Sequence, residues 1–228
     1  MEKVSFYCVN FKNEERKTRI LGRFERLGVP INFVPAVELD DPRLAVDYVK
    51  EKKAASCILG HIDSLKHFVE NTTHDFCVVC EDDVMISKHL KEDLNEFIEM
   101  YDKFSLNVLL LGYLMPYKLE DSHSYFDTLA STDKYKYKTF PDDVWGSQMY
   151  LVSRKNAIDM VERYQPEFIL KNPEIPYSAD WTLTKYGNRL MVYPMLGVEE
   201  GSIQTDHCGQ NNFHQHCYTV NFNPDIHF

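Results

Sequence analysis

The sequence has a deficit of positive charge and no long apolar run. It carries 25 Lys and Arg against 35 Asp and Glu, a formal net charge of −10. A protein that coats duplex nucleic acid or an anionic membrane needs a surplus of cations, so this composition argues against both classes. The longest apolar run, residues 107–113, is far shorter than the ~20 residues that a transmembrane helix requires.

Cysteine is also scarce, with six residues in a chain of 228. That number is too small for a fold built on disulfides, and reduced thiols inside a cell are the default expectation. The N-terminus lacks a basic segment followed by a long apolar stretch, so we expect no cleaved signal peptide. These observations predict a soluble protein of the cytoplasm, or of the host cytoplasm for a viral source.

What the chain does contain is a large apolar and aromatic fraction, 44% and 13% of the residues. A disordered chain would be poorer in both. The length suits a single domain covering residues 1–228.

Strand-like and helix-like segments alternate along the first two thirds of the chain. Short β-rich or apolar runs predict strands at residues 4–11, 31–37, 75–80, 106–112, 147–152 and 190–193. The pattern predicts helices at residues 13–27, 44–53 and 57–70. Ser87, Ser153 and Ser178 are the expected N-caps of further helices at residues 87–103, 153–164 and 178–186. This alternation predicts an α/β fold with a mostly parallel central sheet flanked by helices. We expect residues 115–143 to form a long excursion, and residues 198–228 to form an irregular tail that contributes to the site.

The most informative feature is an acidic triplet, Glu81, Asp82 and Asp83, directly after the buried run at residues 77–80. Ligands of open α/β sheets collect at the carboxyl ends of strands. Three adjacent carboxylates repel one another unless a cation neutralises them. Mg²⁺ and Mn²⁺ prefer oxygen ligands and are often shared with substrate phosphates. The alternative is a solvated acidic turn.

Several segments together resemble glycosyltransferase family 25, which contains bacterial lipooligosaccharide transferases and procollagen galactosyltransferases. The matching segments, in the family's order, are residues 9–11 with Arg16 and Arg19, then 35–37, 57–61 with 64–66, 78–84, 109–112, 146–153 and 179–181. Three residues depart from the family pattern, namely Ser56, Gly60 and Gln148.

The resemblance implies a GT-A-like domain that binds a nucleotide sugar and a metal ion and inverts the anomeric carbon. It implies that Asp83 binds the metal, that Asp82 contacts the ribose or a metal-bound water, and that Glu81 holds the nucleotide side. Further donor-binding residues expected from it are Val9, Asn10, Arg16, His61, Gly146 and Ser147. Arg suits a diphosphate because its guanidinium donates two parallel hydrogen bonds.

Two more roles complete the expected site. Asp180, beside Trp181, is our candidate for the general base that takes the acceptor's proton. The alternative is a carboxylate that only complements the N-terminus of a helix. Late in the chain, His207 is the expected further metal ligand, chosen over Asp206.

These expectations describe a metal-dependent inverting glycosyltransferase. It would move galactose or glucose from a UDP-sugar, with Mn²⁺ or Mg²⁺, to a hydroxyl of a glycan, glycolipid or hydroxylated peptide. The alternatives are a non-enzymatic sugar- or nucleotide-binding module and a metal-dependent phosphohydrolase, which would draw acidic ligands from several strand ends.

Two cysteine patterns are weaker evidence for a functional site. Cys208, His214, His216 and Cys217 have zinc-binding residue types, but their spacing lacks the paired ligands of common zinc modules. Cys77 and Cys80 lie three apart in a predicted strand, so their side chains point to opposite faces and would not form a disulfide.

Overall fold

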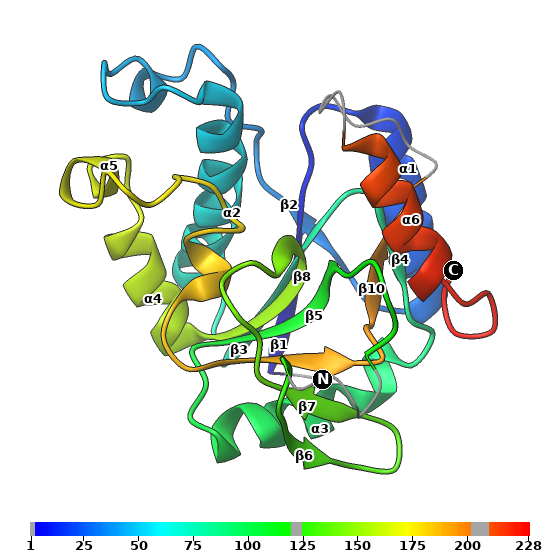
Figure 1. Ribbon diagram of the computed structural model, residues 1–228. Coiled ribbons are helices and arrows are strands. Elements are labelled where there is room, and N and C mark those ends of the chain that lie inside the picture. Colours follow the sequence, from blue (N-terminus) through cyan, green and yellow to red (C-terminus); the bar gives the residue numbers. More distant parts are fainter. Residues whose placement is uncertain (1–2, 120–124, 202–209) are drawn as a thin grey trace.

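A computed structural model describes residues 3–119, 125–201 and 210–228, in which one sheet is covered by helices (Figure 1). The strands are β1 (Val4–Val9), β2 (Asn32–Phe33), β3 (Phe76–Glu81), β4 (Val84–Ile86), β5 (Val108–Leu114), β6 (Thr128–Ser131), β7 (Lys136–Lys138), β8 (Trp145–Ser153), β9 (Arg189–Tyr193) and β10 (Gly197–Glu199). The helices are α1 (Glu14–Leu27), α2 (Lys52–Asn71), α3 (Leu90–Lys103), α4 (Arg154–Arg163), α5 (Phe168–Lys171) and α6 (Asn211–Asn221), with 3₁₀ turns η1 (Pro42–Leu44) and η2 (Leu183–Lys185).

The strand order places several chain segments at one edge of the sheet. The order is β2-β1-β3-β8-β5-β9-β7-β6, and β10 pairs with β5 and β4. Strands β2 and β3 run parallel to β1, and β9 and β10 run parallel to β5, whereas β8 runs antiparallel to both β3 and β5. The carboxyl ends of β1, β3, β5 and β10 therefore lie beside the start of β8, along the edge of the sheet that is formed by strand ends.

Both faces of the sheet are buried, which confirms the predicted α/β class. One apolar cluster joins the sheet to α2 and α4, and the other joins it to α1 and α3. Cys77 belongs to the first cluster and Cys80 to the second, so the two thiols point to opposite faces as expected. In the described ranges, no helix combines the length and apolarity needed to cross a bilayer.

Helix α1 follows its sequence signals closely. The Asn13 side chain accepts a hydrogen bond from the Arg16 N–H at the start of the helix. Gly28 ends it with φ 60°, a left-handed conformation that glycine adopts at little cost. This helix holds Arg16 just beyond the end of β1.

Three predicted elements are shorter than expected. The strand predicted at residues 31–37 pairs with β1 over only Asn32 and Phe33, because it lies at the sheet edge and Pro35 has no N–H to donate. The helix predicted at residues 44–53 is reduced to the turn η1, and α2 begins at Lys52. Near residue 180, threonine hydroxyls bind backbone carbonyls and only the turn η2 forms.

Two segments are more regular than expected. Residues 115–143 contain the hairpin of β6 and β7, which extends the sheet beside β9. The tail predicted as irregular contains the end of β10 and helix α6. Packing rather than helical pattern holds α6, since Cys217 is buried and the Asn221 amide donates to the Met115 carbonyl at 2.6 Å. The expected cap Ser87 lies two residues before the actual N-cap of α3, His89, and its hydroxyl accepts from the His89 N–H.

Candidate active site

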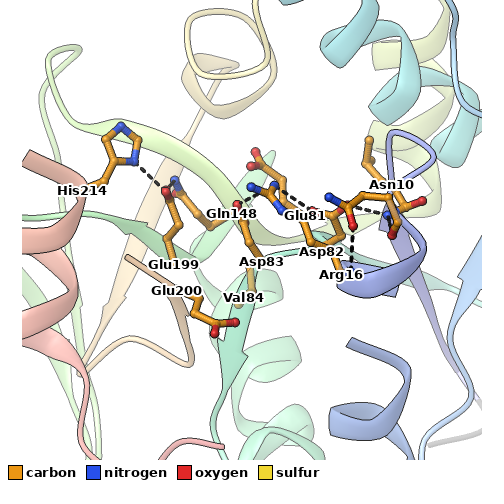
Figure 2. A network of polar contacts seen from close by, with 12 residues as sticks. Asn10, Arg16, Glu81, Asp82, Asp83, Val84, Gln148, Glu199, Glu200 and His214 are labelled. Carbon is orange, nitrogen blue, oxygen red and sulfur yellow. Dashed lines mark hydrogen bonds and ion pairs between the residues drawn. The ribbon is translucent and has the colours of Figure 1, made fainter. Parts of the chain in front are cut away.

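The acidic triplet lies at the shared edge of the sheet, where β1, β3, β8 and β10 meet (Figure 2). Glu81 ends β3, while Asp82 and Asp83 form the turn that leads into β4. Asp82 and Asp83 are almost fully buried. The carboxylates therefore stand in a protein environment and are not a solvated turn.

Asp82 is held from the β1 side. The Asn10 amide donates to Asp82 Oδ2 at 2.5 Å, and Arg16 Nη1 donates to Asp82 Oδ1 at 3.3 Å. The same Arg16 nitrogen lies 3.2 Å from Asp83 Oδ2 (Figure 2). Burial raises the pKa of Asp82 although Arg16 and Asn10 act in the opposite direction. A single guanidinium thus serves two carboxylates.

Asp83 is the carboxylate of the cluster whose negative charge is least offset by its contacts. Its Oδ1 atom is buried and has no hydrogen-bond partner among the described residues. Burial, with Glu199 and Glu81 nearby, raises the pKa of Asp83 well above its usual value. A cation placed at Oδ1 would remove this penalty.

Strand β10 brings a second pair of acids to the edge. Glu199 is buried and accepts from Gln148 Nε2 at 3.0 Å and pairs with His214 Nδ1 at 2.6 Å (Figure 2). The hydrogen bond to Glu199 raises the pKa of His214. Glu200 pairs with Arg19 and Arg23 of α1, and its N–H donates to the Asp83 carbonyl at 2.7 Å. These contacts fix β10 and α1 against the acidic turn.

Glu81 faces β8 and α2. The Ser147 hydroxyl donates to Glu81 Oε1 at 2.6 Å, and His61 Nε2 lies 3.8 Å from the same oxygen. Burial acts to raise the pKa of Glu81, but His61 and Ser147 outweigh it and the pKa is lowered. Cys57, His61 and Glu81 place their ligand atoms within 4.8 Å of one another, a donor set that suits a softer ion such as Zn²⁺.

Asp180 reaches the site from the turn before η2. Its Oδ1 accepts from the Gly146 N–H at 2.9 Å. Burial and the charge of Glu81 raise the pKa of Asp180 despite this hydrogen bond. Gly146 has φ 124°, so glycine is required where the backbone turns toward Asp180.

The charge balance of the site favours a divalent cation. Five carboxylates gather here: Glu81, Asp82, Asp83, Asp180 and Glu199. In the described part of the chain, the Arg and His side chains that contact them are Arg16, His214 and His61. The Asp83 oxygen, which no described residue binds, and the other carboxylate oxygens fit Mn²⁺ or Mg²⁺.

Most of the predicted residues come together in this cluster. Val9 lies in register with Glu81 and packs so closely against Gly60 that a Cβ there would lie 2.9 Å from Val9 Cγ1. His207, like Asp206 and Cys208, lies outside the described residues. Its predicted role as a metal ligand stays a prediction.

Three residues of the network were missed by the sequence reasoning: Gln148, Glu199 and His214. Glu199 and Glu200 follow the apolar residues 195–198, which is the same strand-then-acid pattern as the triplet. That signal was available for Glu199. No sequence signal singled out His214 from the other histidines, because its role depends on how α6 packs.

The fold is that of GT-A-like glycosyltransferases. The chain shares it with a glycosyltransferase involved in the glycosylation of the major capsid of PBCV-1, with a TM-score of 0.51, 11% identity, and coverage of 95% of this chain and 99% of that one. A mannose-1-phosphate geranyltransferase from Thermus thermophilus is more distant, with a TM-score of 0.44, 16% identity, and coverage of 83% and 73%. At these identities the likeness concerns the fold alone.

The family model described as "Glycosyltransferase family 25 (LPS biosynthesis protein)" matches residues 3–172, about three quarters of the sequence. The chain belongs to this family and is a glycosyltransferase, which confirms the resemblance and excludes a non-enzymatic binding module. No curated protein matches the chain.

Proposed function

We propose that this enzyme is a metal-dependent inverting hexosyltransferase that uses a UDP-sugar, with galactose or glucose as the transferred sugar. The acceptor is a hydroxyl of a glycan, a glycolipid or a hydroxylated peptide. The observation that supports this most directly is the buried Asp83 carboxylate, whose Oδ1 has no hydrogen-bond partner among the described residues and faces a surplus of negative charge. A metal ion shared with a diphosphate would balance that charge.

The metal would be held by Asp83, with Asp82 beside it and Mn²⁺ or Mg²⁺ as the ion. Glu199, whose charge acts on Asp83, is proposed as a further ligand, and His214 would orient it through their 2.6 Å contact. His207 remains a candidate. When bound, the ion supplies Lewis-acid neutralisation of the departing diphosphate. Since such ions keep waters and phosphate oxygens in their shell, few protein ligands are needed.

The nucleotide would bind on the β1 side of the triplet. Val9 ends β1, Asn10 follows it, and Arg16 projects from α1 onto Asp82 and Asp83. If a cation neutralised the carboxylates, the Arg16 guanidinium could donate to the diphosphate, for which its geometry is suited. Glu81, His61, Gly146 and Ser147 lie on the β8 side, where they would face the sugar end of the donor. This role for Glu81 replaces the contact with the nucleotide side that the family resemblance implies.

Asp180 is proposed as the general base. The Gly146 N–H fixes one carboxylate oxygen and leaves the second to accept the acceptor's proton. Its raised pKa makes it a stronger base than a solvated aspartate, which suits proton abstraction from a hydroxyl. An inverting transfer needs the acceptor oxygen to attack opposite the leaving group. A base on the β8 side, across β3 from Asn10 and Arg16, would support that direction of attack.

The phosphohydrolase alternative gains one observation, since Glu199 supplies an acid from a second strand end. Family membership nevertheless decides for glycosyl transfer.

The test is release of UDP from a panel of UDP-hexoses, with and without Mn²⁺. We expect turnover that requires the metal and falls by about 100-fold or more in Asp83→Asn, which corresponds to about 2.7 kcal/mol of barrier. Asp133→Asn, an exposed carboxylate between β6 and β7, is the matched control. Activity of Asp83→Asn within tenfold of the wild type would contradict the metal assignment.

A further inference from the structure

Three aromatic rings meet beside Asp180. Trp145 begins β8, Trp181 follows Asp180 in the turn before η2, and Phe213 lies in the first turn of α6. The centroid of the Trp145 ring lies 6.3 Å from that of Trp181 and 6.4 Å from that of Phe213. Trp145 is 37% exposed and the other two are half-buried. We call these three residues the aromatic cluster.

Each member of the cluster adjoins a polar residue of the site. Trp145 precedes Gly146, whose N–H donates to Asp180, and Trp181 directly follows Asp180. Phe213 precedes His214, which pairs with Glu199. In each of three separate segments, an aromatic residue of the cluster is next in sequence to a residue of the polar site. The cluster therefore borders that site.

The cluster lies on the opposite side of the triplet from the nucleotide residues. Asn10 and Arg16 approach from β1 and α1, on one side of β3, whereas Trp145 comes from β8 on the other side. A donor held at Asn10 and Arg16 therefore leaves the cluster for the second substrate. That substrate must also reach Asp180.

We propose that the aromatic cluster is the acceptor site, and that the acceptor is a pyranose sugar whose apolar C–H face packs on these rings. This inference rests on the proposed function and narrows its acceptor. Trp presents a large apolar face with a polar N–H, which suits a ligand that is apolar on its ring face and polar at its rim. Asp180, Glu81 and Glu199 can accept hydrogen bonds from neutral hydroxyls, whereas they would repel an anionic ligand.

Tryptophan fluorescence can probe the aromatic cluster directly. The chain contains two tryptophans, and both are in the aromatic cluster. Intrinsic tryptophan fluorescence therefore reports on this place alone. If the rings only pack against each other to cover the site, sugars will not change the signal.

The experiment titrates the full chain, with UDP and Mn²⁺ present, against methyl hexosides and short oligosaccharides. We expect a saturable change in fluorescence and protection of the tryptophans from acrylamide quenching. Sorbitol, which has hydroxyls but no ring, should do neither. A free glycan compared with the same glycan on a lipid carrier then separates a soluble acceptor from a glycolipid.

Single substitutions show which ring reports the fluorescence change and which ring binds the sugar. Trp181→Phe leaves Trp145 as the reporter, and Phe213→Ala should weaken sugar binding by about tenfold or more in that background. Leu129→Ala removes an apolar side chain that is 52% exposed on β6, away from the cluster, and should leave the titration unchanged.

The possible failures are distinguishable. If UDP-hexose is turned over but no pyranoside changes the fluorescence, or only a hydroxylated peptide does, the acceptor inference is wrong and the proposed function stands. If pyranosides saturate the signal but no UDP-hexose is ever turned over, the proposed function fails while the sugar site remains.

Discussion

At the scale of single residues, the site contains buried charged groups that lower the stability of the folded protein. Asp83 and Asp180 are both buried enough that their pKa values are raised, and Arg16 is shared between Asp82 and Asp83. Natural proteins accept such a loss of stability where a group must act. Neutralising one of these carboxylates should therefore separate activity from stability.

Asp180→Asn should lower glycosyl transfer by more than about 100-fold and leave the melting temperature equal or higher. The asparagine oxygen can still accept from the Gly146 N–H, while the cost of a buried charge disappears. The sign follows from linkage, because an acid with a raised pKa in the folded state destabilises that state at pH values above its unfolded pKa. Transfer and thermal unfolding are measured on the same preparation.

The wild-type pH profile provides the second readout. Since the base must be deprotonated, kcat/KM should fall as the pH drops through the raised pKa of Asp180. A variant rate within tenfold of the wild type, about 1.4 kcal/mol of barrier, would exclude Asp180 as the base.

The sequence predicted those residues whose signal is local. Glu81, Asp82 and Asp83 follow a buried run, and Arg16 lies in the first turn of the helix that follows β1. His214 and Phe213 could not be found in this way, because α6 reaches the site only through tertiary packing against β10 and Met115. The aromatic cluster likewise depends on three segments that are distant in the sequence.

At the scale of elements, the position of β10 depends on two glycines. Gly112 of β5 pairs in register with Gly197 of β10. A Cβ on Gly112 would lie 2.6 Å from the Gly197 carbonyl oxygen. The two backbones can therefore approach this closely only with glycine at position 112. Glu199 is two residues further along the same short strand.

Gly112→Ala should destabilise the fold by about 1–3 kcal/mol, the usual cost of forcing an extra methyl group into a packed interior. It should also weaken Mn²⁺ binding, because displacement of β10 moves Glu199 away from Asp83. Gly22→Ala is the matched control, since a Cβ there meets nothing within 4 Å and the helix gains about 1 kcal/mol. Calorimetric unfolding and Mn²⁺ titration measure both effects; an unchanged Mn²⁺ affinity in a folded Gly112→Ala protein would contradict the coupling.

Elements were predicted well where a buried pattern and a cap agree. Residues 13–27 had an apolar stripe and a Gly stop, and α1 forms there. Residues 178–186 had an expected Ser cap and a Gly stop, but threonine side chains compete for the backbone carbonyls and the segment remains a turn. This turn is what brings Asp180 and Trp181 to the end of β8.

At the scale of the whole molecule, the site joins the two ends of the chain. Asn10 and Arg16 come from the first strand and helix, and Glu199 and His214 come from the last strand and helix. Asp82 and Asp83 lie between these two groups. A metal–nucleotide pair would contact both, so each ligand should strengthen the other's binding.

Mn²⁺ and UDP should therefore bind cooperatively. We expect Mn²⁺ to raise the affinity for UDP by at least about tenfold, and linkage requires UDP to raise the affinity for Mn²⁺ by the same factor. Uridine, which lacks the diphosphate, should bind with an affinity independent of the metal. Isothermal titration of each ligand in the presence and absence of the other measures both factors. If UDP and Mn²⁺ bind independently, the metal is not shared with the diphosphate, and the charge surplus around Asp83 must serve another ligand.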